Sequence, residues 1–183
     1  MTNQTIIIGL LGIIVLTGLS VNDAFAAGYI KFDGIDGEYA VRGHEKWINL
    51  ESWSFGATQA GTGGGGGGAG KVIMQDFHFT KNVDKASPKL FESVTTGKHI
   101  KDATLEICRT SEGQSQSQCY LIIKFTDVVI SGYQLGGSGD TIPTDQISFN
   151  FAKIELEYKP QKPDGSLDAP VKAGYDLKKN VKV

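Results

Sequence analysis

The segment that comes nearest to a chemical motif is the glycine tract at Gly65–Lys71, which reads GGGGAGK. A phosphate-binding loop places a Lys and then a Ser or Thr after its glycines, so that the hydroxyl reaches Mg²⁺. Here Val72 occupies the hydroxyl position, and a strand-like alternation follows where the motif needs a helix N-terminus to hold phosphate. The tract is therefore predicted to be a mobile or extended loop between two strands, whose backbone presses against a neighbouring surface.

The histidines and carboxylates do not form a recognisable catalytic set. His78 and Asp76 would share one face of a strand, but the sequence supplies no evident third ligand, and zinc sites need three or four. Glu155 and Glu157 could suggest a carboxylate pair for glycoside hydrolysis, yet they lie on one strand and fit an exposed face. Gly136–Asp140 (GGSGD) matches neither a nucleophile elbow nor a calcium-binding repeat, and predicts a turn. We expect no enzyme activity, cofactor or metal site.

The two cysteines, Cys108 and Cys119, flank a polar turn. If Gly113-Gln114 forms a two-residue turn, the cysteines are equally far from it and face each other on adjacent strands. We therefore predict a disulfide that stabilises the fold by about 2–3 kcal/mol, which requires an oxidising compartment. Two free thiols are the alternative, and a bridge between subunits is a less economical one. Because the spacing is not CxxC, neither a redox motif nor a zinc site is predicted.

Residues 1–26 are predicted to form a signal peptide. The apolar run Ile6–Leu19 is too short for a comfortable membrane span, and it is followed by the small-x-small pattern of Ala24 and Ala26. No Lys or Arg precedes the run, so an uncleaved anchor is the alternative. Cleavage after Ala26 would leave a domain of residues 27–183, secreted or held at the cell surface, with no membrane attachment.

Length, composition and charge narrow the class of protein. The 183 residues suit one domain with a real core, and 40 % hydrophobic against 21 % charged residues argues against disorder. The full chain carries 20 acids and 18 bases, and removal of residues 1–26 takes away Asp23 and no base, leaving 19 against 18. A nearly neutral chain is not expected to bind nucleic acid, which normally requires a strongly basic face.

The elements that would position these residues are mostly strands, with one helix. Ser87 as N-cap, Pro88 at the first helical position and Gly97 at the end predict that helix. The combination indicates a barrel or sandwich with a helix packed on it. The expected strands are Tyr29–Phe32, Trp47–Phe55, Val72–Phe79, Thr104–Arg109, Cys119–Ile130, Ile147–Tyr158 and Gly174–Leu177.

The Ile147–Tyr158 segment changes phase part-way along. Ile147 and Phe151 share one face, whereas Ile154 and Tyr158 share the other. This slip predicts a β-bulge, or a strand that passes between two environments, as happens where a sheet curls into a barrel.

Many short stretches, in order, resemble one known family. They are Ser52–Gly56, Gly64–Val72, Gln75-Asp76, Phe79–Lys81, Asp84-Lys85, Ser87-Pro88, Gly97–His99, Tyr120–Ile123, Gly136–Gly139, Asn150–Ala152, Tyr158–Lys162 and Val171-Lys172. The chain resembles the haemolysin-coregulated protein (Hcp) family, the tube proteins of type VI secretion. The resemblance implies a mainly β fold, a small barrel of two curled sheets with one flanking helix. It also implies that six subunits close into a ring, and that rings stack into a hollow tube which carries effector cargo.

The resemblance further assigns contacts between subunits and stacked rings to a protruding loop at 59–71. Head-to-tail interfaces with cyclic symmetry account for both kinds of assembly. The expected partners are thus other copies of the chain, with secreted effector cargo or a spike protein in addition. The loop residues singled out are Gln59, Gly63, Gly64, Gly65, Gly66, Gly67, Gly68, Gly70 and Lys71.

The predicted signal peptide is a departure from that family, whose typical members are loaded from the cytoplasm without one. We therefore expect a tube or filament on or outside the cell, without a contractile sheath. A monomeric exported barrel that binds glycans is the alternative, with Trp47 and Trp53 as stacking platforms if they are not core residues. A hydrolase lacks a supporting set of side chains.

Overall fold

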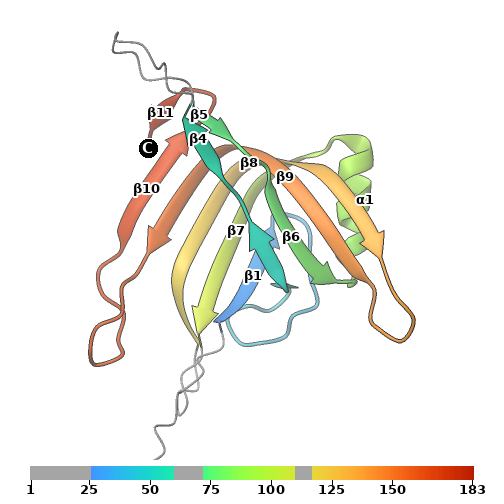
Figure 1. Ribbon diagram of the computed structural model, residues 1–183, viewed down its shortest axis with the longest axis horizontal. Coiled ribbons are helices and arrows are strands. Elements are labelled where there is room, and N and C mark those ends of the chain that lie inside the picture. Colours follow the sequence, from blue (N-terminus) through green and yellow to red (C-terminus); the bar gives the residue numbers. More distant parts are fainter. Residues whose placement is uncertain (1–25, 60–71, 110–116) are drawn as a thin grey trace, which may run out of the picture.

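A computed structural model describes residues 26–59, 72–109 and 117–183, and confirms a mainly β fold with one helix (Figure 1). The elements are β1 (Ala26–Phe32), β2 (Ile48–Leu50), β3 (Ser52–Ser54), β4 (Ala57–Gln59), β5 (Val72–Met74), β6 (Phe77–Asn82), α1 (Ser87–Thr96), β7 (His99–Arg109), β8 (Gln118–Gly136), β9 (Thr144–Tyr158), β10 (Val171–Asp176) and β11 (Val181–Lys182). No helix within these described ranges is long and apolar enough to cross a membrane.

The main sheet is antiparallel and strongly curled, with the strand order β11-β10-β9-β8-β7-β1-β2. It turns back on itself because β3, which follows β2 after one residue, pairs with β6, and β6 in turn pairs with β9. The barrel is not closed by a continuous ladder, and the N–H of Glu51, donating to the Thr80 carbonyl at 2.9 Å, bridges the bend. A separate hairpin, β4–β5, lies in front of the sheet in Figure 1.

The strand β9 pairs with β8 along one edge, and along its other edge it has two different neighbours. This change of neighbour determines the shape of the sheet. The first half of β9 pairs with β6 from Thr144 to Phe149, and its second half pairs with β10 from Lys153 to Tyr158. The second half therefore leaves the curled part, and β8, β9 and β10 extend the sheet to the left in Figure 1, away from α1. We call this part the β8–β10 extension.

Aromatic rings fill the curled part. Phe77 and Phe149 are fully buried with centroids 5.0 Å apart, and Phe125 meets Phe149 edge-on at 5.0 Å. Such ring pairs add about 0.5–1.5 kcal/mol to the free energy gained by burying their area. Aliphatic side chains from β1, β7 and β8 complete this core, so that strands far apart in the sequence share one interior.

The helix begins at its predicted cap, one residue earlier than expected. Ser87 is the first helical residue, and Ala86 precedes it with no side-chain cap, so the N-cap assignment to Ser87 is wrong. The Ser87 hydroxyl is instead drawn into a buried polar cluster with Lys81, whose Nζ donates to it at 2.8 Å. The predicted end is found: Gly97 has φ 63°, a left-handed conformation that glycine adopts without a Cβ penalty.

Two predicted strands are each divided in two. Trp47–Phe55 breaks at Glu51, where the chain bends from β2 into β3, and Val72–Phe79 breaks at Gln75-Asp76, between β5 and β6. Aromatic and apolar content gave the right element type, but the bends follow from a change of partner strand. The short strands β4 and β11 were not predicted.

Candidate functional site

The predicted assembly loop at 59–71 connects the two strands of the β4–β5 hairpin. Gln59 is the last residue of β4 and lies opposite Val72, the first residue of β5. The ladder therefore holds Gln59 and Val72, the residues on either side of 60–71, next to each other, and β4 itself is exposed. The remaining residues assigned to this loop lie outside the described residues: Gly63, Gly64, Gly65, Gly66, Gly67, Gly68, Gly70 and Lys71.

At the predicted cleavage site, Ala26 is the first residue of β1 and pairs with Arg109, whereas Ala24 lies outside the described residues. Ala27, which cleavage would leave at the new terminus, pairs with Cys108. Cleavage after Ala26 would thus remove a single position from the β1–β7 ladder and leave its other six pairs.

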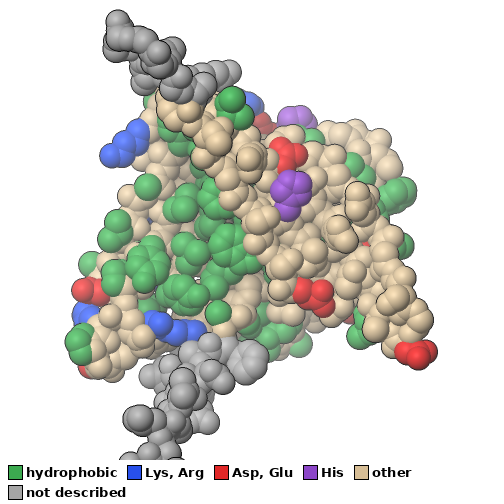
Figure 2. Space-filling view, in the orientation of Figure 1, with side chains coloured by type: hydrophobic (Ala, Val, Ile, Leu, Met, Phe, Trp, Pro, Cys, Tyr) green, Lys and Arg blue, Asp and Glu red, His purple; other side chains and the backbone are tan. Residues whose placement is uncertain are grey.

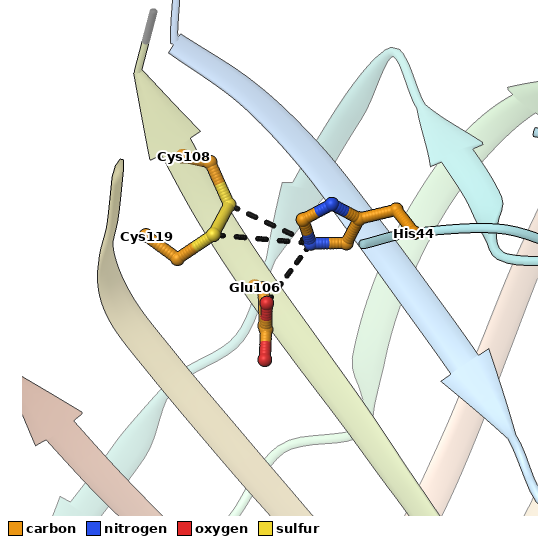
Figure 3. A group of neighbouring side chains, drawn as sticks. All are labelled: His44, Glu106, Cys108 and Cys119. Atoms are coloured by element: carbon orange, nitrogen blue, oxygen red, sulfur yellow. Dashed lines mark hydrogen bonds and ion pairs between the residues drawn. A yellow bond between two sulfur atoms is a disulfide. The ribbon is translucent and has the colours of Figure 1, made fainter. Parts of the chain in front are cut away.

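The two cysteines lie directly opposite each other on β7 and β8, and a disulfide joins them. His44, from the segment between β1 and β2, points its ring at this pair and at Glu106 (Figure 3). His44 Nε2 lies 2.9 Å from a carboxylate oxygen of Glu106. Sequence reasoning missed both residues, because 62 positions separate them and no local pattern connects them.

A large apolar surface lies on the inner face of the β8–β10 extension. Tyr158 is paired with Leu121 and Val171, and Leu156 with Ala173, so these side chains point to the side that holds the core further along. Val171 is 66 % exposed and Tyr158 49 %. Figure 2 shows hydrophobic side chains gathered over this part of the sheet. The surface, here called the β8–β10 apolar face, comprises Leu121, Leu156, Tyr158, Val171, Ala173 and Tyr175.

The outer face of the same strands has the opposite character. Glu157 forms ion pairs with Lys172 at 2.9 Å and Lys159 at 3.3 Å, and Lys153 pairs with Glu155 at 2.9 Å. The hydrogen bond from Lys172 holds the pKa of the Glu157 carboxyl below its ordinary value. These two glutamates therefore belong to an ion-paired outer face, as expected from the sequence. Both line a depression of about 290 Å³ on that face, where the lysine partners neutralise their charge.

A second apolar surface surrounds the helix. Phe91 is 54 % exposed and Leu135 63 %, and the Phe91 ring meets Tyr133 edge-on at 5.6 Å. A groove of about 590 Å³ runs between α1 and the end of β8. Its lining, here called the helix-side surface, consists of Val83, Asp84, Ser87, Pro88, Phe91, Tyr133 and Leu135. The helix lies at the right of Figure 1, on the opposite side from β10.

A buried charged cluster holds the base of the helix-side surface in place. Lys81 and Asp145 are both fully buried and pair at 2.8 Å, and Lys81 also reaches Asp84 at 2.6 Å. Ser87 and Tyr133 each donate a hydrogen bond to Asp145. Burial would raise the pKa of Asp145, but the bonds from Lys81, Ser87 and Tyr133 outweigh it and lower that pKa. Burial and the bond to Asp145 raise the pKa of Tyr133 to about 12.

The other residues considered for chemistry or ligand binding are dispersed. Asp76 accepts a hydrogen bond from Ser131, and His78 is exposed on β6. Trp53 stacks on Phe77 at 5.9 Å, and Trp47 lies edge-on to His44 at 4.9 Å. Both tryptophans are partly buried by packing and do not form a shared stacking platform.

The family is decided by sequence comparison. A family described as "Type VI secretion system effector, Hcp" matches residues 29–158, which is most of the chain. The chain belongs to the Hcp family. Protein hcp1 of Pseudomonas aeruginosa is 41 % identical over 157 residues, covering 84 % of this chain and 96 % of that protein.

Solved structures support the same assignment. A type six secretion system protein superposes with a TM-score of 0.78 at 32 % identity, covering 86 % of this chain and 99 % of its own. Hcp1 from Salmonella typhimurium gives 0.69 at 26 % identity, with coverage of 86 % and 99 %. A type VI secretion system effector from Yersinia pestis gives 0.65 at 33 % identity, with coverage of 81 % and 98 %. The chain is thus a tube or effector protein of the type VI secretion class, from a family of structural proteins and not of enzymes.

Proposed function

We propose that six copies of this Hcp-family chain close into a ring, and that rings stack into a hollow tube through the loop at 59–71. The subunit acts through its interfaces alone, without a reactive pocket. After export and removal of residues 1–26, the tube or filament forms outside the cell, where the Cys108–Cys119 disulfide is stable. Secreted effector cargo or a spike protein would be its further partners.

The observation that carries the proposal is the presence of two different apolar surfaces on opposite sides of the subunit. Head-to-tail rings need two such surfaces, because each copy offers one to the neighbour before it and the other to the neighbour after it. The β8–β10 apolar face and the helix-side surface meet this requirement. Contiguous apolar area of this kind is unusual on a monomer and marks a contact surface.

Part of the β8–β10 apolar face is exposed in the described part of the chain: Tyr158, Val171 and Ala173 are exposed, whereas Leu121, Leu156 and Tyr175 are partly buried against the core. This face continues the core face of Ile123 and Ile154, both fully buried, onto residues such as Val171 that the curled part does not reach. Its aromatic and aliphatic composition without charge suits the centre of a protein interface. A neighbouring copy would supply the missing layer.

Size-exclusion chromatography with light scattering on residues 27–183 tests the assembly. The expected result is a uniform species of six protomers, with annular or tubular particles in electron micrographs. A strict monomer at all concentrations would contradict it and would favour a monomeric exported binding module. The mass of the exported chain tests the signal peptide, because cleavage after Ala26 predicts a mature chain beginning at Ala27.

A further inference from the structure

The side chains around the disulfide include donors that a metal ion would accept. His44 Nε2 lies 2.9 Å from Glu106 Oε2, 3.7 Å from Cys108 Sγ and 3.8 Å from Cys119 Sγ (Figure 3). All four candidate ligand atoms lie within 4.8 Å of one another. Among the described residues, this is the one group of three or more such side chains brought so close together.

The spacing suits a tetrahedral zinc ion. Zinc binds sulfur at about 2.3 Å and nitrogen or oxygen at about 2.0–2.2 Å, so neighbouring ligand atoms lie roughly 3.4–3.8 Å apart. The distances from His44 to both sulfurs already fall at this separation, and Glu106 would move outward by about half an ångström. The two sulfurs are bonded to each other and must also part to reach it, which only reduction of the disulfide permits. Bonded to each other, the sulfurs carry no thiolate charge to offer the ion, and reduction supplies that charge.

The imidazole is held in position independently of any ligand. His44 is 5 % exposed, and its ring packs against Tyr29 at 4.4 Å and Trp47 at 4.9 Å. Its backbone N–H donates to the Val41 carbonyl at 2.9 Å, which fixes the turn that carries it. Nδ1 is buried without a hydrogen-bond partner, so packing of the ring, and not a bond at its far side, aims Nε2 at the cysteines.

The site is also open enough for an ion to enter. Glu106 retains 23 % of its side-chain exposure, and Cys119 is only partly buried, whereas His44 and Cys108 are buried. Two of the ligands are buried and two are partly exposed, so the cluster reaches the surface at Glu106 and Cys119. Glu106 and Cys108 are two positions apart on β7 and therefore share a face, so the strand itself sets their spacing.

We propose that reduction of the Cys108–Cys119 disulfide turns this cluster into a zinc site with Cys108, Cys119, His44 and Glu106 as ligands. A dithiol reductant gives two electrons and two protons to the disulfide and becomes a cyclic disulfide itself. Zinc then displaces both thiol protons, and the proton on His44 Nε2 moves to Nδ1, so each ion bound releases two protons. Before oxidation, the metal would tie β7, β8 and the His44 turn together where the disulfide later ties β7 to β8.

Cobalt(II) titration of the reduced, full-length chain tests this site, since cobalt reports thiolate ligation by charge-transfer bands and tetrahedral geometry by its visible bands. The expected result is saturation at one cobalt per chain, displacement by zinc, and no such bands in the oxidised protein. Cys108→Ser with Cys119→Ser should abolish the bands. His44→Gln and Glu106→Gln should each weaken cobalt affinity at least 10-fold, the smaller end of what supporting residues contribute.

His99→Gln is the matched control, because His99 also pairs with a carboxylate, that of Asp127 at 2.6 Å, but lies outside the cluster. It should bind cobalt like the parent chain, and circular dichroism should show that every variant keeps its strands. Absence of thiolate bands in the reduced parent would overturn the proposal. So would equal affinity in His44→Gln and His99→Gln, which would leave the two thiolates binding the metal without this cluster.

Discussion

At the scale of single residues, the buried Lys81–Asp145 pair is the interaction whose disruption is expected to lower the stability of the fold most. Both side chains are fully buried. Lys81 pairs with Asp145 and Asp84 and donates to the Ser87 hydroxyl, while Asp145 accepts hydrogen bonds from Ser87 and Tyr133. Removal of one partner of a buried pair leaves an uncompensated charge, which costs about 3–5 kcal/mol. This cluster joins β6, β9 and the first turn of α1, so its loss would loosen the helix-side surface.

Lys81→Met is therefore expected to lower the free energy of unfolding by about 3–5 kcal/mol in urea denaturation at neutral pH. Lys89→Met is the control, because Lys89 forms a comparable pair with Glu92 at 2.9 Å, but in solvent, where such pairs contribute about 0–1 kcal/mol. Equal losses in the two variants would mean that the buried pair has no special role.

The pH dependence of the same cluster has a definite sign. Because the folded state lowers the pKa of Asp145, this group stabilises the protein above its unfolded pKa of about 3.9, and the contribution disappears as the pH falls through the folded value. Asp145→Asn lacks this contribution. The stability gap between the parent and Asp145→Asn should thus be full at pH 6 and shrink below about pH 4. A gap that stays constant into acid would contradict the assignment.

The cysteine pair gives a second residue-scale prediction. In a metal-free buffer, reduction should add two hydrogens to the mass of the purified chain, and Cys108→Ser with Cys119→Ser should cost about 2–3 kcal/mol of stability. The bridge closes a short loop, with a sequence separation of 11, which limits the effect. An unchanged mass on reduction would show that the thiols are free.

Sequence reasoning reached the cysteines but not the groups around them. The facing positions of Cys108 and Cys119 follow from counting residues to a turn, which is local information. His44 follows β1 in the chain and reaches the same place only because β1 pairs with β7, and the Lys81–Asp145 pair exists only because β6 pairs with β9. Contacts of that kind depend on strand order, which residue spacing does not encode.

At the scale of elements, the sequence showed the phase change in Ile147–Tyr158 but did not show its cause. Of the two explanations offered, the passage between two environments matches the structure, since β9 exchanges β6 for β10. The register with β8 is continuous across the change, and β8 adapts in step, with Asp127 at φ 55°. The register shifts that involve β8 lie elsewhere: one against β9 between Ile130 and Gly132, and one against β7 between Ile107 and Cys108.

The glycine tract gives the prediction that belongs to this scale. Deletion of Gly63–Gly68 is expected to impair stacking of rings while the barrel stays folded, because the β4–β5 ladder that bears the tract contacts no other strand by hydrogen-bonded pairing. Circular dichroism and light scattering should show a folded ring, and electron microscopy should show fewer or shorter tubes. Tubes of unchanged length would remove this loop from the stacking interface.

At the scale of the whole molecule, the exposed apolar area follows from the course of β9. Once its second half leaves the curled part, one side of β8, β9 and β10 is left partly exposed within the described residues, as at Val171 and Tyr158, although its residues keep the apolar character of a core face. Under the proposed assembly such a surface would be retained because neighbouring copies contact each other through it. The sequence pattern showed apolar alternation in these strands, but it could not separate core from interface.

Complementary variants test whether the two apolar surfaces meet head to tail. Val171→Asp places a charge on the β8–β10 apolar face, and Phe91→Asp places one on the helix-side surface, so each variant alone should be monomeric in light scattering. An equimolar mixture should form a dimer that grows no further, because one intact surface from each variant remains to pair. Lys172→Ser changes the net charge by the same amount on the outer face, and should still form rings.

The mixture also separates this arrangement from a symmetric contact. If the β8–β10 apolar face paired with its own copy, Phe91→Asp alone would remain dimeric, and mixing would add nothing. A mixture that stays monomeric would contradict the pairing of these two surfaces even if rings of the parent chain are seen. The dimer is expected only where different surfaces on successive copies meet, which is the geometry that lets a chain of subunits close into a ring.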